Sequence, residues 1–192
     1  MKKLLFLTPE LPYPPQSGGK VKSLKLLDAL AERYEVTLVS PLKQEDPHNL
    51  ADFAARSPCV AHEHTEVQVP RSAKNLLVSY LRGRPLNIHR SFDPVLAARV
   101  KKLAPAHDLI VLDHYEASIY LPANYQGTVV SHAHNAYHQM WNRYARLPGN
   151  PLFRAAALLE AYRVRRAEIQ TARRADLVFA APNDTETLRH FG

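Results

Sequence analysis

The chain has almost no cysteine and no long apolar run, and each shortage excludes a class of protein. Cys59 is the single cysteine among 192 residues, so no disulfide can form within the chain, which fits a reducing compartment. No segment approaches the ~20 apolar residues of a transmembrane helix. The opening Lys pair is typical of a signal peptide, but the apolar stretch 4–7 is too short for one and prolines follow it. We therefore expect a cytoplasmic protein.

Several signature motifs of nucleotide-binding and catalytic proteins are missing as well. Lys20 follows two glycines, but the spacing is not that of a phosphate-binding P-loop, and no G-x-G-x-x-G is present. The second absence argues against an NAD-binding enzyme. There is no G-x-S-x-G nucleophile elbow, and Cys59 has no clear histidine partner, which disfavours a thiol nucleophile.

The composition that remains is that of a globular domain. Hydrophobic residues make up 46% of the chain and charged residues 22%, which separates it from disordered chains. A chain of this length forms one ordinary domain or half of a two-domain protein. About 70% of its unfolded surface can be buried at this size, so a substantial core is expected.

The positive charge of the chain is concentrated in the segment 71–102. This segment contains eight basic residues and one acidic residue, Asp93, so its formal charge of +7 equals that of the whole chain. The basic residues are Arg71, Lys74, Arg82, Arg84, Arg90, Arg99, Lys101 and Lys102. Such a patch attracts phosphates, nucleic acid or anionic lipid, and a solvated helix face is the plain alternative. Nucleic acid is disfavoured because interleaved aromatic residues and known binding motifs are absent.

The pattern of apolar residues predicts strands and helices in alternation. Short apolar runs bounded by turn residues indicate buried strands, and apolar residues at helical spacing indicate amphipathic helices. We expect strands at 2–8, 35–41, 65–70, 108–114, 127–133 and 176–182. We expect helices at 17–34, 46–56, 72–83, 93–104, 151–175 and 183–191. The alternation predicts an α/β fold, a Rossmann-like, doubly wound and mainly parallel sheet with helices on both faces.

Chemistry-bearing residues follow several of these strands. In a doubly wound sheet, ligands bind outside the carboxyl ends of the strands. Gly18 and Gly19 stand at the start of a helix, where free N–H groups and the helix dipole favour an anion; a tight turn without ligand is the alternative. The pairs Asp113–His114 and His132–His134 also fall at strand ends.

The stretch SHAHNAYH (131–138) leaves three interpretations open. His132 and His134 share one face if the strand continues, and His138 follows His134 at a helical spacing. Three histidines can hold zinc, although such sites usually recruit an acid or cysteine as well. A single histidine acting as base or hydrogen-bond donor is favoured over metal, because its pKa lies near neutrality. An inert histidine at a strand end is the third interpretation.

Five segments, taken in order, resemble the amino-terminal domain of retaining GT-B glycosyltransferases. Similar residues occur in the "glycosyltransferase family four" type of bacterial sugar transferases. The segments are LTPELPYPPQSGGKVKSLKLLDALAERYEVTLVS, GRPLNIHRSFDP, DLIVLDHYEA, HAHNAYHQMWNRYA and ALLEAYRVRRAEIQTARRADLVFAAPNDTETL. Each segment alone is weakly specific, and the ordered series is more so. The resemblance covers nearly the whole chain.

The resemblance implies a domain organisation and an activity. Residues 1–182 would be a Rossmann-like acceptor-side domain, one half of a GT-B architecture, and residues 183–192 would begin the hinge. The carboxyl-terminal donor domain, with its E-x7-E motif, would be absent from this chain, which alone would be inactive. The whole enzyme would move a sugar from a nucleotide-diphosphate sugar to an acceptor hydroxyl, in the synthesis of cell-surface polysaccharide or glycolipid.

The resemblance also assigns roles to residues. Gly18, Gly19 and Lys20 would lie near the donor phosphates. His134 would lie near the transferred sugar, with His132 as the second candidate for that role.

Acceptor contacts would come from the two middle strand ends. Asp113 and His114 would contact the acceptor, and so would Asn135 and Tyr137. Relatives often read H-N-V-E where this chain has His134, Asn135, Ala136 and Tyr137, so this chain has a tyrosine in place of that glutamate.

Cofactors and partners follow from the same resemblance. No metal is required, and the donor is a substrate rather than a cofactor. The acceptor would be a glycan or a lipid-linked molecule, and nucleic acid is not expected. Segment Arg71–Lys102 would dock on anionic lipid at the inner face of the cytoplasmic membrane, helped by the apolar residues Leu76, Leu77, Tyr80 and Leu81.

Two alternatives stand beside this function. The first is a non-catalytic module that binds a sugar or a nucleotide. The second is a metal hydrolase that would use His132, His134 and His138.

Overall fold

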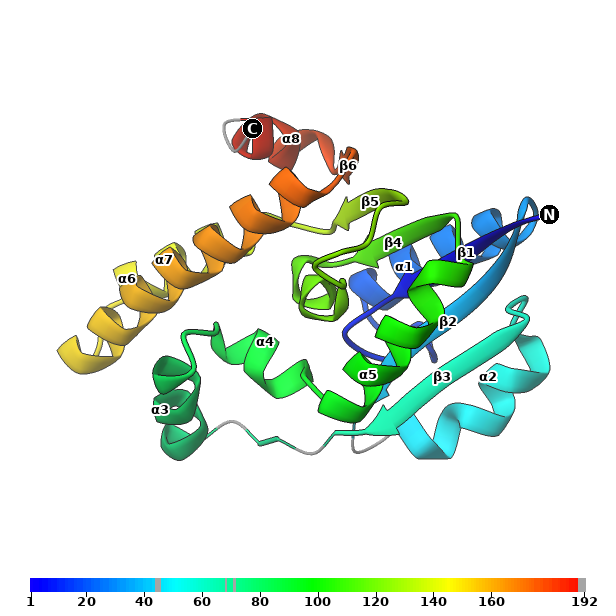
Figure 1. Cartoon of the computed structure of the whole chain (residues 1–192). Helices are drawn as coiled ribbons and strands as arrows, with labels where there is room; N and C mark the ends of the chain where they lie inside the picture. Colours follow the sequence, from blue (N-terminus) through cyan, green and yellow to red (C-terminus); the bar gives the residue numbers. More distant parts are fainter. Residues whose placement is uncertain (44–45, 68, 71, 190–192) are drawn as a thin grey trace.

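The computed structural model describes residues 1–43, 46–67, 69–70 and 72–189, and a six-stranded sheet forms its centre (Figure 1). The strand order is β3-β2-β1-β4-β5-β6, and every neighbouring pair is parallel. The strands are β1 (Lys2–Leu7), β2 (Tyr34–Leu42), β3 (Ala61–Glu66), β4 (Leu109–Asp113), β5 (Thr128–Ala133) and β6 (Leu177–Ala180). The prediction of a Rossmann-like, doubly wound α/β fold is confirmed.

Helices connect the strands, and several begin at a capping residue that the sequence supplies. The α-helices are α1 (Gly18–Ala31), α2 (Leu50–Arg56), α3 (Ala73–Leu81), α4 (Leu86–Ser91), α5 (Pro94–Leu103), α6 (Tyr137–Arg146), α7 (Pro151–Arg174) and α8 (Pro182–Arg189). Short 3₁₀ helices are η1 (Asp46–Asn49), η2 (Ala104–Ala106) and η3 (Tyr115–Tyr120). Ser17 caps α1 by accepting a hydrogen bond from the Lys20 N–H, and Asp93 caps α5 in the same way. In the described part of the chain no helix is both long and apolar enough to cross a membrane.

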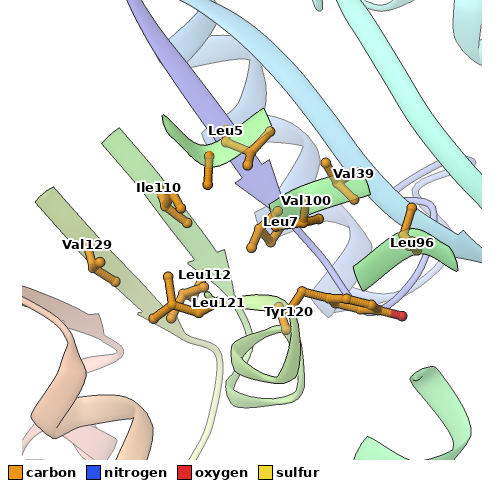
Figure 2. Packing of buried hydrophobic residues seen from close by; sticks show 12 residues of the cluster. Leu5, Leu7, Val39, Leu96, Val100, Ile110, Leu112, Tyr120, Leu121 and Val129 are labelled. Atoms are coloured by element: carbon orange, nitrogen blue, oxygen red, sulfur yellow. The ribbon is translucent and has the colours of Figure 1, made fainter. Parts of the chain in front are cut away.

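The core has two halves, one on each face of the sheet. Side chains of a strand alternate between the faces, so Leu5 and Leu7 of β1 enter one half while Leu4 and Phe6 enter the other. The first half contains Leu96 and Val100 of α5 and is drawn in Figure 2. The second half contains Leu27 of α1 and Phe53 of α2. Fully burying one such side chain stabilises the fold by about 1.5–3 kcal/mol.

Two details of the sequence prediction are wrong. A strand was expected at 65–70, but β3 lies at Ala61–Glu66, because its pairing with β2 ends where β2 ends, at Leu42 opposite Glu66. The helices α4 and α6 were not expected as separate elements. Helix α4 has only six residues, too few for a clear apolar period, and Ala136, the residue before α6, has no capping side chain that would mark the start of that helix.

The hairpin of α6 and α7 projects away from the sheet in Figure 1, and α8 follows β6. Part of the sequence prediction falls outside the described residues, namely Arg71, residue 68 of the expected strand and residues 190–192 of the expected hinge. The described part of that hinge, residues 183–189, lies within α8. The domain boundary and the hinge stay predictions.

The strand order reverses between β1 and β4. From β1 the chain moves outward through β2 and β3, and then returns to β4 on the other side of β1. In doubly wound sheets the crevice at such a switch point binds ligands. The carboxyl ends of β1, β4 and β5 therefore meet where the sequence placed its histidines.

Candidate functional site

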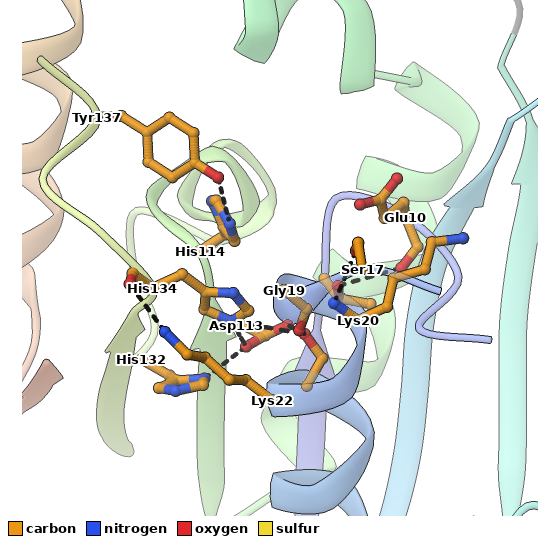
Figure 3. Close-up of polar contacts among 12 residues, drawn as sticks. Glu10, Ser17, Gly19, Lys20, Lys22, Asp113, His114, His132, His134 and Tyr137 are labelled. Atoms are coloured by element: carbon orange, nitrogen blue, oxygen red, sulfur yellow. Dashed lines mark hydrogen bonds and ion pairs between the residues drawn. The ribbon is translucent and has the colours of Figure 1, made fainter. Parts of the chain in front are cut away.

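The carboxylate of Asp113 is the centre of a hydrogen-bonded cluster at the carboxyl ends of β4 and β5 (Figure 3). His132 Nδ1 lies 2.7 Å from Asp113 Oδ1, and His134 Nε2 lies 2.8 Å from the same oxygen. Ser23 of α1 donates its hydroxyl to Asp113 Oδ2 at 2.6 Å. Asp113 is fully buried. The cluster therefore joins two strands and one helix through a single carboxylate.

The protonation of this cluster follows from its contacts. Burial alone would raise the pKa of Asp113, but the hydrogen bonds from His132, His134 and Ser23 outweigh it and hold the pKa well below its usual range. A carboxylate can only accept, so both imidazole nitrogens that touch it carry hydrogen. In a neutral His134 the other ring nitrogen, Nδ1, is then an acceptor.

His134 Nδ1 faces the N-terminus of α1. A methyl group placed on Gly19 would lie 3.4 Å from this nitrogen, so the backbone of the helix start and the imidazole are neighbours. His134 Nδ1 is buried and has no hydrogen-bond partner among the described residues. Gly18 and Gly19 are the first residues of α1, and their N–H groups have no carbonyl of a preceding turn to bond. An unpartnered imidazole nitrogen and free N–H groups thus meet at one point.

Lys20 and Lys22 bring positive charge to this helix start. The Lys20 ammonium lies 3.5 Å from Asp46 Oδ1, and both side chains are largely buried. Lys22 Nζ donates to the backbone oxygen of His134 at 3.3 Å. Lys20, which the sequence suggested for the donor phosphates, is therefore ion-paired, and Lys22 is the cation that touches the histidine segment.

His114 connects the cluster to a cavity. It follows β4 directly, with φ = 82°, a conformation that non-glycine residues adopt at a cost of about 1–3 kcal/mol. Its ring lies 4.3 Å from that of His134, and its Nε2 lies 3.2 Å from the Tyr137 hydroxyl. Burial lowers the pKa of His114 to about 3, so this imidazole is neutral. The strained backbone fixes a neutral imidazole between His134 and Tyr137.

The cavity has a volume of about 450 Å³ and lies on the far side of His114. Polar and charged side chains line much of it: Glu10, Lys43, Asn87, Arg90, Ser91, His114, Glu116 and Tyr137. Burial raises the pKa of Glu116 to about 7, against opposing effects of Lys43, Asn87 and Arg90. Burial also raises the pKa of Tyr137 to about 12. The cavity can therefore offer both hydrogen-bond donors and acceptors to a polar ligand.

His138 belongs to a different part of the structure. Its Nδ1 lies 2.6 Å from Glu168 Oε2, while Glu168 Oε1 accepts the Tyr137 N–H, also at 2.6 Å. Glu168 thus caps the start of α6 and attaches it to α7. The histidine trio considered for a metal hydrolase is therefore not brought together, and Asp113 takes the place of His138 beside His132 and His134.

The structure assembles most of the residues that the sequence suggested. Gly18, Gly19, Asp113, His132 and His134 lie within one cluster. His114 and Tyr137 line the adjoining cavity, and Asn135 is exposed next to them.

Sequence reasoning missed the contributions of Ser23, Glu116 and Glu168. Ser23 is four residues after Gly19, so it lies on the same face of α1, and this spacing was a usable signal. Glu168 is one of two acids in the long helix of residues 151–174, but no local pattern marks its partner His138. Glu116 stands within three residues of Asp113, yet nothing in the sequence indicates that it is buried.

The chain was compared with protein families, curated proteins and solved structures. No family model matches the chain, and no curated protein matches it. The crystal structure of Arabidopsis thaliana UGT89C1 complexed with UDP is similar, with 13% sequence identity and a TM-score of 0.46. The similarity covers 99% of this chain and 47% of that one, so this chain spans about half the length of that structure.

Proposed function

We propose that this chain is the acceptor-side half of a glycosyltransferase of the family-four type. The enzyme moves a sugar from a nucleoside-diphosphate sugar to an acceptor hydroxyl, in the synthesis of a cell-surface polysaccharide or glycolipid. Residues 1–182 form the acceptor-side domain, residues 183–192 begin the hinge, and the donor domain lies in a further part of the protein.

One observation carries this proposal. The N-terminus of α1 and the unpartnered nitrogen of His134 lie side by side at Gly19, next to a polar cavity. A helix start stabilises the negative charge that develops on a leaving diphosphate. The cavity lies beyond His114 and has room for a sugar-sized acceptor. Donor phosphate and acceptor would thus meet at His134.

The backbone and side-chain groups of the cluster have different roles in the proposed reaction. The N–H groups of Gly18 and Gly19 hold the diphosphate, and Lys20, paired with Asp46, adds a fixed positive charge. His134 Nδ1 accepts a hydrogen bond from a hydroxyl of the transferred sugar or of the acceptor. Asp113 is buried and its carboxylate accepts hydrogen bonds from His132, His134 and Ser23, so its role is to position His134 and fix its tautomer rather than to contact the acceptor.

The remaining residues serve the acceptor or the cluster. His132 holds the second hydrogen bond to Asp113. His114, Asn135 and Tyr137 contact the acceptor from the cavity side, together with Glu116. As the sugar–phosphate bond breaks, the acceptor oxygen bonds to the sugar and its proton leaves with the diphosphate or to solvent. No metal is needed for these steps.

Transfer assays on the full gene product test the proposal. A panel of nucleoside-diphosphate sugars is incubated with the enzyme, and release of the nucleoside diphosphate is measured. We expect His134→Gln to lower kcat/KM at least about tenfold, which corresponds to ~1.4 kcal/mol of lost transition-state stabilisation. His107→Gln is the matched control, because His107 is half-buried and bonds Thr37 and Leu103 near the amino-terminal end of β4, away from the carboxyl ends where the cluster lies.

Two results would overturn this function. If the wild-type gene product consumes no nucleoside-diphosphate sugar, the non-catalytic binding module takes its place. If His107→Gln lowers the rate as much as His134→Gln does, the effect of His134→Gln is structural and not catalytic.

The membrane partner is a separate part of the proposal. The described basic residues of segment 71–102 lie on α3, α4 and α5 and the short connections between them. Leu77 and Leu81 of α3 are exposed by 58% and 80%, whereas Tyr80 packs against Arg163 of α7. We infer that α3 presents these leucines and its flanking lysine and arginines to anionic lipid, at the inner face of the cytoplasmic membrane.

Liposome co-sedimentation tests this docking. We expect binding to phosphatidylglycerol vesicles but not to phosphatidylcholine vesicles, and a clear loss in Leu77→Glu/Leu81→Glu. Binding that does not depend on anionic lipid would contradict docking through this segment.

A further inference from the structure

The cluster around Asp113 also brings three potential metal-ligand atoms close together. One carboxylate oxygen and two imidazole nitrogens offer one ligand atom each, and all of these atoms lie within 4.8 Å of one another. Both nitrogens point at the same oxygen, Oδ1, at 2.7 and 2.8 Å. The rings of His132 and His134 lie 4.5 Å apart. Figure 3 shows the two imidazoles converging on Asp113 from the β5 side.

Two histidines and one carboxylate are a ligand set that divalent transition metals use. Zinc binds imidazole nitrogen at about 2.0–2.1 Å and carboxylate oxygen at about 2.0–2.2 Å. Such ligand atoms then lie about 3.0–3.4 Å from one another, so the two oxygen–nitrogen contacts would lengthen by about half an ångström around a bound ion. Ser23 Oγ lies 2.6 Å from Asp113 Oδ2 and 3.5 Å from His134 Nε2, where a hydroxyl or a water can complete the coordination.

We propose that Asp113, His132 and His134 form a binding site for one divalent transition-metal ion of the zinc or cobalt type. Two strand ends fix the ligands, since Asp113 pairs with His132 in the register of β4 and β5. His134 is buried, while the His132 side chain is 17% exposed and provides the path from solvent. Metal binding at this site does not require glycosyltransferase activity, so this proposal is independent of the proposed function.

One nearby positive charge disfavours the binding of a metal ion. Lys22 donates to the backbone oxygen of His134 at 3.3 Å, and its ammonium repels a second positive charge. The Lys22 side chain comes from the exposed surface of α1, so it can swing away. Removing this lysine is expected to tighten metal binding.

Metal binding has a consequence for His134 that rests on the proposed function. In the hydrogen-bonded cluster, Nε2 carries the hydrogen and Nδ1 is an acceptor. When Nε2 binds a metal, a neutral imidazole carries its hydrogen on Nδ1 instead. The nitrogen that faces Gly19 then changes from acceptor to donor. Metal occupancy would therefore slow a transfer reaction that needs His134 as an acceptor.

Cobalt spectroscopy on this chain tests the site without any substrate. The protein is stripped with EDTA, dialysed and titrated with Co²⁺ while the visible d–d bands are recorded, and Zn²⁺ is then added as a competitor. We expect one equivalent of Co²⁺ to bind and Zn²⁺ to displace it. Asp113→Asn and His132→Gln should weaken Co²⁺ binding at least about tenfold, and Lys22→Ala should strengthen it about threefold or more.

His62→Gln is the matched control. His62 and His64 form a close imidazole pair away from this cluster, with rings 4.7 Å apart, on β3. This variant should bind Co²⁺ as the wild type does. If Asp113→Asn does not fold, His132→Gln and Lys22→Ala test the site instead, because both side chains reach solvent and their replacement disturbs the fold less. The proposal is overturned by the absence of d–d bands in the wild type, by bands that persist in His132→Gln, or by bands lost in His62→Gln.

Discussion

Replacing Asp113 by asparagine removes one charge from the cluster while keeping its shape. The carboxylate accepts three hydrogen bonds, from His132, His134 and Ser23. A hydrogen bond to a charged group contributes about 1.5–3 kcal/mol and a neutral one about 0.5–1.5 kcal/mol, so each of the three weakens by about 1 kcal/mol. We expect Asp113→Asn to lower the free energy of unfolding by about 3 kcal/mol. For a domain of this size that is a fall of about 6–12 °C in Tm.

Urea denaturation followed by circular dichroism, with EDTA present to keep the cluster metal-free, measures this change. Asp93→Asn is the control, because Asp93 caps α5 by accepting the Leu96 N–H and asparagine is an equally good capping residue. The control should stay within about 0.5 kcal/mol of the wild type. If Asp113→Asn also stays within that margin, the three contacts do not stabilise the fold as the geometry implies.

Two further predictions concern other buried acids. The pKa of Glu116 is raised to about 7, so the folded state holds its proton more tightly than the unfolded state does. Stability should therefore fall by about 3 kcal/mol as the pH rises from about 4.5 to 7, and Glu116→Gln should flatten this dependence in urea titrations at several pH values. An unchanged pH profile in the variant would contradict the assignment. Glu168→Ala leaves the Tyr137 N–H and His138 without their buried acceptor and should cost about 2–4 kcal/mol in the same assay. Glu186→Ala, on the exposed face of α8, should have little effect, and equal losses in the two variants would refute the role of Glu168.

The sequence predicts the sheet well because its inner strands carry strong local signals. Leu4–Leu7 and the residues from Leu109 to Leu112 are continuous apolar runs, which a sheet covered on both faces requires. Segment 61–66 is different, since AHEHTE has no apolar alternation, and its pairing with β2 alone makes it a strand. Long-range pairing of this kind leaves no mark in the local sequence.

The sequence indicates that the candidate residues lie close together, but it indicates only part of their contacts. Residues at the ends of neighbouring parallel strands must meet, so His132 and His134 could be placed near Asp113 and the start of α1. Which nitrogen bonds which oxygen depends on the register of β4 with β5, which the sequence does not encode locally. The link between His138 and Glu168 spans 30 residues and depends on how α6 packs on α7.

The central claim is that the start of α1, beside His134, binds a diphosphate. The chain has six glycines, so ¹⁵N-glycine labelling resolves the amides of Gly18 and Gly19 among very few signals. We would titrate the labelled chain with UDP, GDP, ADP and inorganic pyrophosphate and follow these amides by NMR. The account predicts saturable shifts of Gly18 and Gly19 with at least one of these ligands, while Gly83 and Gly149 in remote turns stay unchanged. Gly18 and Gly19 signals that do not move, even at millimolar ligand, would contradict it.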